Sequence, residues 1–270
     1  MKDLLQPRHR SALARLVGVD RPEKVLLAFD YDGVLAPLVR TPSGARMRPA
    51  TRALLERLVR RYPVAVVSGR AWKDLERMVD GAVSNLVGNH GCELLHPSPV
   101  PRSVLRKVRG WERRMEAALA GVPGIHIEDK ASTFAVHYGL SRSWRSAQRA
   151  VYEAANALPG TRLIPGKKVV NVLPHDFPTK GDAVRALLAK FDCEVALYLG
   201  DDVTDEDVFA VGAPLVFGVH VGKGPSLAPW RITRQEDVDE LLRRLIRARA
   251  SAEERGPPAA SPARAQGTRR

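Results

Sequence analysis

Three short apolar runs constrain the fold of this chain more than any other feature. They are VLLAF at residues 25–29, VAVV at 64–67 and VALYL at 195–199, and none alternates with polar residues. Such runs are typical of strands buried on both faces, as in a parallel sheet covered by helices. Apolar residues with helical spacing lie between the first two runs, at 54, 55, 58 and 59, and a helix also fits 180–191, directly before the third run. The pattern predicts βαβ units and an α/β fold.

The middle of the chain follows a different pattern. Two helical segments there are mixed with strands that alternate between apolar and polar residues, which predicts an α+β layer with one open sheet face. We therefore predict a core of residues 22–98 and 175–246, interrupted by an inserted domain of residues 99–174. Residues 1–21 form an N-terminal segment in this interpretation.

Polar residues follow each apolar run directly. They are Asp30-Tyr31-Asp32-Gly33, Ser68-Gly69-Arg70 and Gly200-Asp201-Asp202. In open α/β sheets, ligands bind at the carboxyl ends of the strands. If the three strands are parallel neighbours, all three clusters meet in one crevice.

Several carboxylates at one sheet edge repel each other, and two like charges 4 Å apart cost about 4 kcal/mol at an effective dielectric of 20. A hard divalent cation removes this penalty, and Mg²⁺ suits one or two carboxylates together with a phosphate oxygen. Lys180 begins a predicted helix and would add positive charge, and Ser68 lies at a turn whose free N–H groups favour an anion. The combination indicates a phosphate site with bound Mg²⁺.

Each motif has a weaker interpretation when taken alone. DYDG also fits a turn, and GDDVTDED also fits a helix N-terminus whose acidic residues match the helix dipole. Asp202 and Asp205 are predicted either to belong to a metal site, as ligands or as partners of its ligands, or to cap the following helix. Only the order and combination of the clusters favour chemistry over structure.

In that order, Asp30-x-Asp32-Gly33, Ser68, Lys180 and Gly200-Asp201-Asp202 resemble the four motifs of the haloacid dehalogenase-like (HAD) hydrolases. The second aspartate is typical of the phosphatases and phosphomutases of that superfamily. A narrower resemblance, to the trehalose-6-phosphate phosphatase family, covers about residues 24–245. It is carried by DYDGVLAPLV, VAVVSGR, LVGNHGCELL, IEDKASTFAVHY, GKKVVNVLP and YLGDDVTDEDVF.

The resemblance implies a Rossmann-like HAD core with a parallel sheet and an inserted α/β cap domain. It also implies that Asp30 attacks phosphorus and forms an aspartyl-phosphate. Asp32 would protonate the leaving sugar oxygen and then activate water. Ser68 and Lys180 would hold the phosphoryl oxygens, and Asp30, Asp32 through its carbonyl, and Asp201 would bind Mg²⁺.

Residues expected to contact substrate are Ser68, Gly69, Arg70, His90, Glu93, Lys130, His137, Lys168 and Asn171. His90 and His137 are equally compatible with packed or surface histidines. The chain departs from the family at Asn171, where relatives carry a glutamate that grips sugar hydroxyls, and at Leu173 and Gly139, where they carry arginine. An amide is not equivalent to a carboxylate as an acceptor of hydroxyl protons. The expected substrate is a disaccharide phosphate, most simply trehalose 6-phosphate; the alternatives are a related disaccharide or cyclitol-containing phosphate and, without catalysis, a sugar-phosphate sensor or polyanion-binding protein.

Composition limits the partners. The net charge is +13, and residues 243–270 hold eight arginines against two glutamates. Residues 250–270 lack an apolar period and predict a disordered basic tail, which makes nucleic acid an unlikely partner for the rest of the chain. The two cysteines predict no disulfide framework, and no segment predicts a membrane span or a signal peptide. We expect a cytoplasmic protein with a small sugar-phosphate substrate and no membrane partner; a monomer is plausible.

Overall fold

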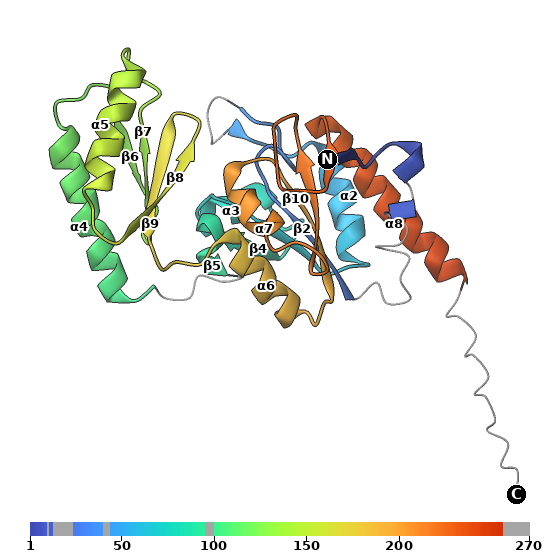
Figure 1. Cartoon of the computed structure of the whole chain (residues 1–270). Coiled ribbons are helices and arrows are strands. Elements are labelled where there is room, and N and C mark those ends of the chain that lie inside the picture. Colours follow the sequence, from blue (N-terminus) through green and yellow to red (C-terminus); the bar gives the residue numbers. More distant parts are fainter. Residues whose placement is uncertain (10, 13–23, 40–43, 95–99, 256–270) are drawn as a thin grey trace, which may run out of the picture.

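The computed structural model describes residues 1–9, 11–12, 24–39, 44–94 and 100–255, with side chains described as far as residue 250. It contains two sheets that lie apart in the molecule (Figure 1). The larger one has eight strands among the described residues, in the order β1-β12-β11-β10-β2-β3-β4-β5. Its strands are β1 (Lys2–Asp3), β2 (Val25–Phe29), β3 (Val64–Val67), β4 (Asn85–Gly88), β5 (Glu93–Leu94), β10 (Val195–Gly200), β11 (Val216–Val221) and β12 (Trp230–Ile232).

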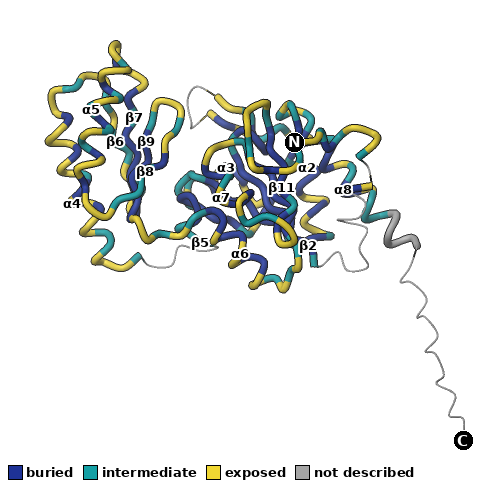
Figure 2. Tube along the Cα trace, viewed as in Figure 1, coloured by how far each residue is buried: buried dark blue, intermediate teal, exposed yellow. Residues whose placement is uncertain are grey.

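The sheet is parallel except for β5, which pairs antiparallel with β4. Helices cover both faces, as the unbroken runs predict. In β2, Val25, Leu27 and Phe29 pack in the cluster that holds the apolar residues of α2 (Pro49–Val59), α3 (Trp72–Val79) and α8 (Val238–Arg255). The alternate residues Leu26 and Ala28 pack with α6 (Lys180–Lys190) and α7 (Glu206–Phe209). Figure 2 shows the buried residues following these strands through the centre of the larger sheet.

The smaller sheet lies between β5 and α6 in the chain. Its strands are β6 (His126–Asp129), β7 (Phe134–His137), β8 (Thr161–Gly166) and β9 (Val169–Pro174), in the antiparallel order β6-β7-β9-β8. Helices α4 (Arg102–Leu119) and α5 (Trp144–Asn156) cover one face, where Phe134, Val136, Val170 and Val172 are buried. The opposite face is turned toward the larger sheet (Figure 1). We call residues 102–174 the inserted unit.

Two ends of the chain differ from the sequence-based expectation. Residues 1–21 were expected to lie outside the core, but Lys2 and Asp3 pair with Trp230 and Arg231 at the sheet edge. A two-residue strand leaves no periodic signal. Helix α8 also continues to Arg255, into the start of the predicted tail, because the alanine-rich sequence after Ile246 favours a helix. The rest of that tail, residues 256–270, lies outside the described residues, as do 13–23 of the N-terminal region and 95–99 before the inserted unit.

Short 3₁₀ turns complete the described elements: η1 (Pro7–His9), η4 (Asn89–Gly91), η5 (Val203–Asp205) and η6 (Gln235–Asp237). Among the described residues, no helix combines the length and the apolar character needed to cross a bilayer.

Candidate active site

The three polar clusters lie at one edge of the larger sheet. Strands β3, β2 and β10 are parallel neighbours, so Ser68, Asp30 and Asp201 leave the sheet side by side. The backbone N–H of Asp30 donates to the Leu199 carbonyl at 2.8 Å, and that of Ser68 donates to the Val87 carbonyl at 2.9 Å. The sheet thus fixes the backbone at both positions. We call this end of the strands the carboxyl edge.

Lys180 lies in the middle of this edge and is 1% exposed. Its Nζ donates to Asp30 Oδ2 and to Asp205 Oδ1, each at 2.8 Å. The helix that carries it begins with a capping box: Thr179 Oγ1 accepts from the Asp182 N–H, and the Asp182 carboxylate accepts from the Thr179 N–H. The cap fixes the first turn of α6 and therefore the start of the Lys180 side chain.

Burial and charge act against each other in this cluster. Burial raises the pKa of Asp30 well above its usual value, and Lys180 only partly offsets this effect. Burial opposes the charge of Lys180, but Asp205 and Asp30 outweigh it and raise the pKa of the ammonium, which stays protonated. At Asp201, burial followed by the neighbouring Asp205 and Asp202 raises the pKa to about 8. One lysine does not compensate these carboxylates fully.

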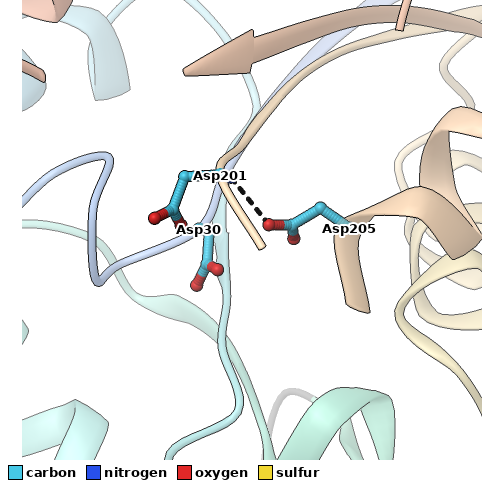
Figure 3. A group of neighbouring side chains, drawn as sticks. All are labelled: Asp30, Asp201 and Asp205. Atoms are coloured by element: carbon cyan, nitrogen blue, oxygen red, sulfur yellow. Dashed lines mark hydrogen bonds between the residues drawn. The ribbon is translucent and has the colours of Figure 1, made fainter. Parts of the chain in front are cut away.

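Asp30, Asp201 and Asp205 could share a cation by distance alone, since one carboxylate oxygen of each lies within 4.8 Å of the others (Figure 3). The oxygen-only donor set fits a hard cation such as Mg²⁺. Gly33 also fits this arrangement. It has φ +72°, and a Cβ added there would come within 1.9 Å of Asp201 Oδ2, so the glycine leaves room for that carboxylate.

The Asp32 side chain is held in an ion pair with Arg70. Arg70 Nε donates to its Oδ2 at 2.6 Å and Arg70 Nη2 to its Oδ1 at 2.7 Å, which forms a bidentate ion pair. The guanidinium also lies over the Tyr31 ring. Arg70, which was predicted to bind substrate, holds both oxygens of Asp32 in one orientation.

The Ser68-Gly69-Arg70 turn is closed by His90. Ser68 is buried, and its Oγ accepts the Arg70 N–H at 3.2 Å. A Cβ added at Gly69 would come within 2.4 Å of His90 Cε1, so only glycine permits this close approach. Burial, then Lys130 and Lys180, lowers the pKa of His90 well below its usual value, which keeps the imidazole neutral. Its buried Nδ1 has no hydrogen-bond partner in the described structure.

Glu93, also predicted to bind substrate, accepts the Trp72 N–H at 2.6 Å through Oε2. Trp72 is the first residue of α3, so this carboxylate anchors the helix N-terminus. Burial raises the pKa of Glu93 against the opposing effect of that hydrogen bond. The structure therefore assigns Glu93 a supporting contact at the start of α3.

Two of the predicted residues in the inserted unit lie beside the carboxyl edge. Lys130 Nζ donates to Asn171 Oδ1 at 3.1 Å and to the Gly69 carbonyl at 3.4 Å. Burial lowers the pKa of Lys130. Lys130 thus connects the open face of the smaller sheet with the turn after β3.

The other two lie at the far end of the smaller sheet. Phe134 begins β7 beside the turn that contacts the core, and His137 ends it, where its Nε2 pairs with Glu128 at 2.8 Å. Lys168 lies in the turn between β8 and β9, with Nζ 5.5 Å from the Trp144 ring centroid. The structure does not bring His137 and Lys168 to the carboxyl edge.

The sequence analysis missed the contact that joins the two units. Asn89 Nδ2 donates to Ser132 Oγ at 3.0 Å, and Asn89 Oδ1 accepts from Thr133 Oγ1 at 2.6 Å. All three side chains are buried, and Asn89 has a left-handed backbone with φ 52°. The sequence gives only one indication of this contact: Asn89 is followed by His-Gly, and asparagine, histidine and glycine adopt positive φ more often than other residues.

Comparisons of the sequence and of the fold with known proteins give matches over most of the chain. The trehalose-phosphatase family model matches residues 28–233. A probable trehalose-phosphate phosphatase 4 of Oryza sativa subsp. japonica is 28% identical over 263 residues, covering 88% of this chain and 71% of that protein. A bifunctional trehalose-6-phosphate synthase/phosphatase of Thermoproteus tenax is 33% identical over 237 residues, covering 83% of this chain and 32% of that protein.

Among solved structures, the C-terminal domain of a Candida albicans trehalose-6-phosphate phosphatase superposes with a TM-score of 0.73. The two are 22% identical, and the match covers 88% of this chain and 96% of that one. This likeness shows the fold: an α/β core with a mostly parallel sheet and a second α/β unit.

Proposed function

This chain belongs to the trehalose-phosphatase family and is a phosphatase, and from that premise we propose that it hydrolyses trehalose 6-phosphate to trehalose and phosphate through an aspartyl-phosphate. The observation that carries the proposal is the position of Lys180. Its ammonium touches Asp30 at the point where the ends of β2, β3 and β10 meet, so a phosphoryl group beside Asp30 would lie against a fixed positive charge.

In the proposed first step, an Asp30 carboxylate oxygen attacks phosphorus in line. A bond forms from Asp30 to phosphorus, and the bond from phosphorus to the sugar oxygen breaks. Asp32, two residues along the same turn, delivers a proton to the departing oxygen. In the second step, Asp32 takes a proton from water, whose oxygen attacks the same phosphorus and releases Asp30.

The other residues of the edge would position the phosphoryl group, because phosphoryl transfer depends on placement and charge more than on covalent help. Ser68 Oγ and Lys180 Nζ are the proposed donors to its oxygens. Mg²⁺, held by the side chains of Asp30 and Asp201 and the carbonyl of Asp32, would neutralise charge on the phosphoryl oxygens. Arg70 keeps the Asp32 carboxylate oriented until substrate arrives.

A second candidate substrate is a related disaccharide or cyclitol-containing phosphate. It is favoured by Asn171, whose amide oxygen is already bonded to Lys130. An amide in this pair presents a different donor and acceptor pattern to sugar hydroxyls than a carboxylate would. Leu173 is fully buried, so this position offers no polar group to a sugar.

Phosphate release from a panel of substrates tests the proposal. The panel contains trehalose 6-phosphate, other disaccharide 6-phosphates, a cyclitol-containing disaccharide phosphate and glucose 6-phosphate, each with Mg²⁺ and with a chelator. We expect the highest kcat/KM for trehalose 6-phosphate and activity only with the metal. Faster turnover of another disaccharide phosphate would select the second candidate, and failure to release phosphate from any of them would refute both.

A further inference from the structure

A fully buried tyrosine lies directly behind the carboxyl edge. Tyr198 is in β10, on the face that packs against α6 and α7, and its ring meets Phe209 edge to face at 5.8 Å. Its Oη donates to Asp205 Oδ1 at 2.6 Å. A phenol in an apolar core is costly unless its hydroxyl is paired, so this hydrogen bond accounts for the tyrosine in a run that is otherwise apolar.

Asp205 collects four donors and is 0% exposed. Its Oδ1 accepts from Tyr198 Oη and Lys180 Nζ, and its Oδ2 accepts from the backbone N–H groups of Asp201 and Asp202 at 2.8 and 2.9 Å. A carboxylate offers about four lone-pair directions, two on each oxygen. All of them are used here, so Asp205 has no lone pair left for a cation although its distance to Asp30 and Asp201 would allow one.

The same four bonds tie together parts of the edge that come from different elements. Asp205 holds the ammonium that touches Asp30, and it holds the peptide N–H of Asp201, whose side chain lies across the site. A small rotation of the Asp205 carboxylate would therefore move Lys180 and the Asp201 backbone together. Tyr198 is the only one of the four donors that does not itself belong to the edge.

We propose that Tyr198 is a positioning residue for the phosphatase reaction: its hydroxyl fixes the Asp205 carboxylate, which directs Lys180 toward Asp30. Among the three carboxylates, metal binding is then left to those of Asp30 and Asp201. The proposal rests on the function proposed above, since it needs Asp30 as the reacting group. Tyr198 touches neither substrate nor metal. Loss of its hydroxyl releases one of the two bonds on Oδ1, and Lys180 then moves toward Asp205 and away from Asp30.

Tyr198→Phe is the direct test, because it keeps the ring and its contact with Phe209 and removes only the hydroxyl. The matched control is Tyr62→Phe, which removes another buried hydroxyl, one that donates to the Leu245 carbonyl on the α8 side of the sheet. We expect kcat to fall about 10- to 100-fold for Tyr198→Phe, as for the loss of a positioning contact, with KM changed less than about threefold. Tyr62→Phe keeps the kcat of the unaltered protein. Equal kcat values for the two variants would overturn the proposal.

Two measurements separate positioning from packing. The first is a double-mutant cycle. Tyr198→Phe should reduce kcat much less in the Asp205→Asn protein than in the unaltered protein, because Tyr198 acts through the Asp205 carboxylate. If the two substitutions reduce kcat independently, so that their fold-losses multiply, this route is contradicted. In a crystal structure of Tyr198→Phe, the distance from Lys180 Nζ to Asp30 Oδ2 should exceed hydrogen-bonding range. An unchanged Lys180 position would also overturn the proposal.

Calorimetric titration of Mg²⁺ into the metal-free protein tests the assignment of Asp205 without using activity. We expect Asp201→Asn to abolish binding and Asp205→Asn to change the Mg²⁺ dissociation constant by less than about tenfold, as for a residue that supports a ligand. Loss of Mg²⁺ binding in Asp205→Asn that matches the loss in Asp201→Asn would make Asp205 a ligand and refute this assignment.

The activity measurements use an aryl phosphate as well as sugar phosphates. If the unaltered protein hydrolyses none of them, the proposed function fails, whereas the Lys180 position and the Mg²⁺ titration still decide whether Tyr198 and Asp205 act as proposed.

Discussion

The carboxyl edge and the open face of the inserted unit hold their polar side chains in opposite ways. At the edge, Lys180 and Asp205 are almost completely buried, and each bond is directional. On the open face, Glu128 and His137 pair while their side chains are 40% and 31% exposed. Exposed pairs contribute little to stability and exchange partners readily. The difference indicates that the polar contacts of the edge are held in fixed positions, whereas this pair on the open face is held only weakly.

The largest expected effect is at the edge. Asp30→Asn removes the proposed nucleophile and should lower kcat by about 10⁴-fold or more, as for other enzymes that lose a nucleophile. The fold should persist, because burial raises the pKa of the Asp30 carboxyl group and so disfavours its charged form, and asparagine carries no charge. Phosphate release and thermal unfolding measured on the same preparation check both statements. Activity within tenfold of the unaltered protein would show that another group attacks phosphorus.

Lys180→Met should have the next largest effect, and it tests whether the carboxyl edge depends on the buried ammonium group of Lys180. It leaves the carboxylates of Asp30 and Asp205 buried without their shared partner, which should cost about 3–5 kcal/mol of unfolding free energy. Urea unfolding in a chelator measures this without any contribution from a bound metal. The control is Lys190→Gln, an exposed lysine at the end of the same helix, which should change stability by less than about 0.5 kcal/mol. Similar losses in the two variants would mean that the carboxylates are neutral in the folded protein.

Asn171→Glu tests the open face. A glutamate there would bring a carboxylate to Lys130, which now bonds the Asn171 amide oxygen at 3.1 Å. We expect the ratio of kcat/KM for trehalose 6-phosphate to that for other disaccharide phosphates to rise about tenfold, while kcat for an aryl phosphate stays the same. Asn171→Gln controls for length without adding charge. A uniform loss on all substrates would place Asn171 in the structure rather than in recognition.

The same contrast explains what could be predicted from the sequence. The convergence of Asp30, Ser68 and Asp201 follows from unbroken apolar runs that end in polar residues, because neighbouring parallel strands end at one edge. From the sequence, Asp205 fitted both a helix cap and a metal site. Its actual contacts are known only from the structure, which shows four buried donors around the carboxylate. Side-chain pairs between distant segments leave no local pattern. The bidentate contact of Arg70 with Asp32 joins residues 38 positions apart, and the bonds of Asn89 to Ser132 and Thr133 cross between the two units.

The smallest expected effect lies where the edge and the inserted unit meet, at His90. The imidazole is buried, and burial together with Lys130, Lys180 and Arg162 lowers its pKa, whereas its contact with Asn171 acts in the opposite direction. The folded protein therefore binds a proton at His90 less readily than the unfolded chain, whose histidine titrates near pH 6.5. Stability that is fully present above about pH 6.5 is lost as the pH falls toward the folded pKa, because protons then favour the unfolded state.

His90→Asn removes this titration and suits the positive φ of 60° at this position, since asparagine adopts the left-handed region more readily than most residues. The substitution also removes packing against Gly69, so a constant loss of stability is expected at every pH. The informative quantity is the slope. Between pH 8 and pH 5, in a chelator, the unfolding free energy of the unaltered protein should fall more steeply than that of His90→Asn. The control His126→Asn alters an exposed histidine of the inserted unit and keeps His90, so its unfolding free energy should fall as steeply as that of the unaltered protein. Parallel curves for the unaltered protein and His90→Asn would show that His90 binds a proton as readily in the folded protein as in the unfolded chain. Water would then reach the junction between the two units.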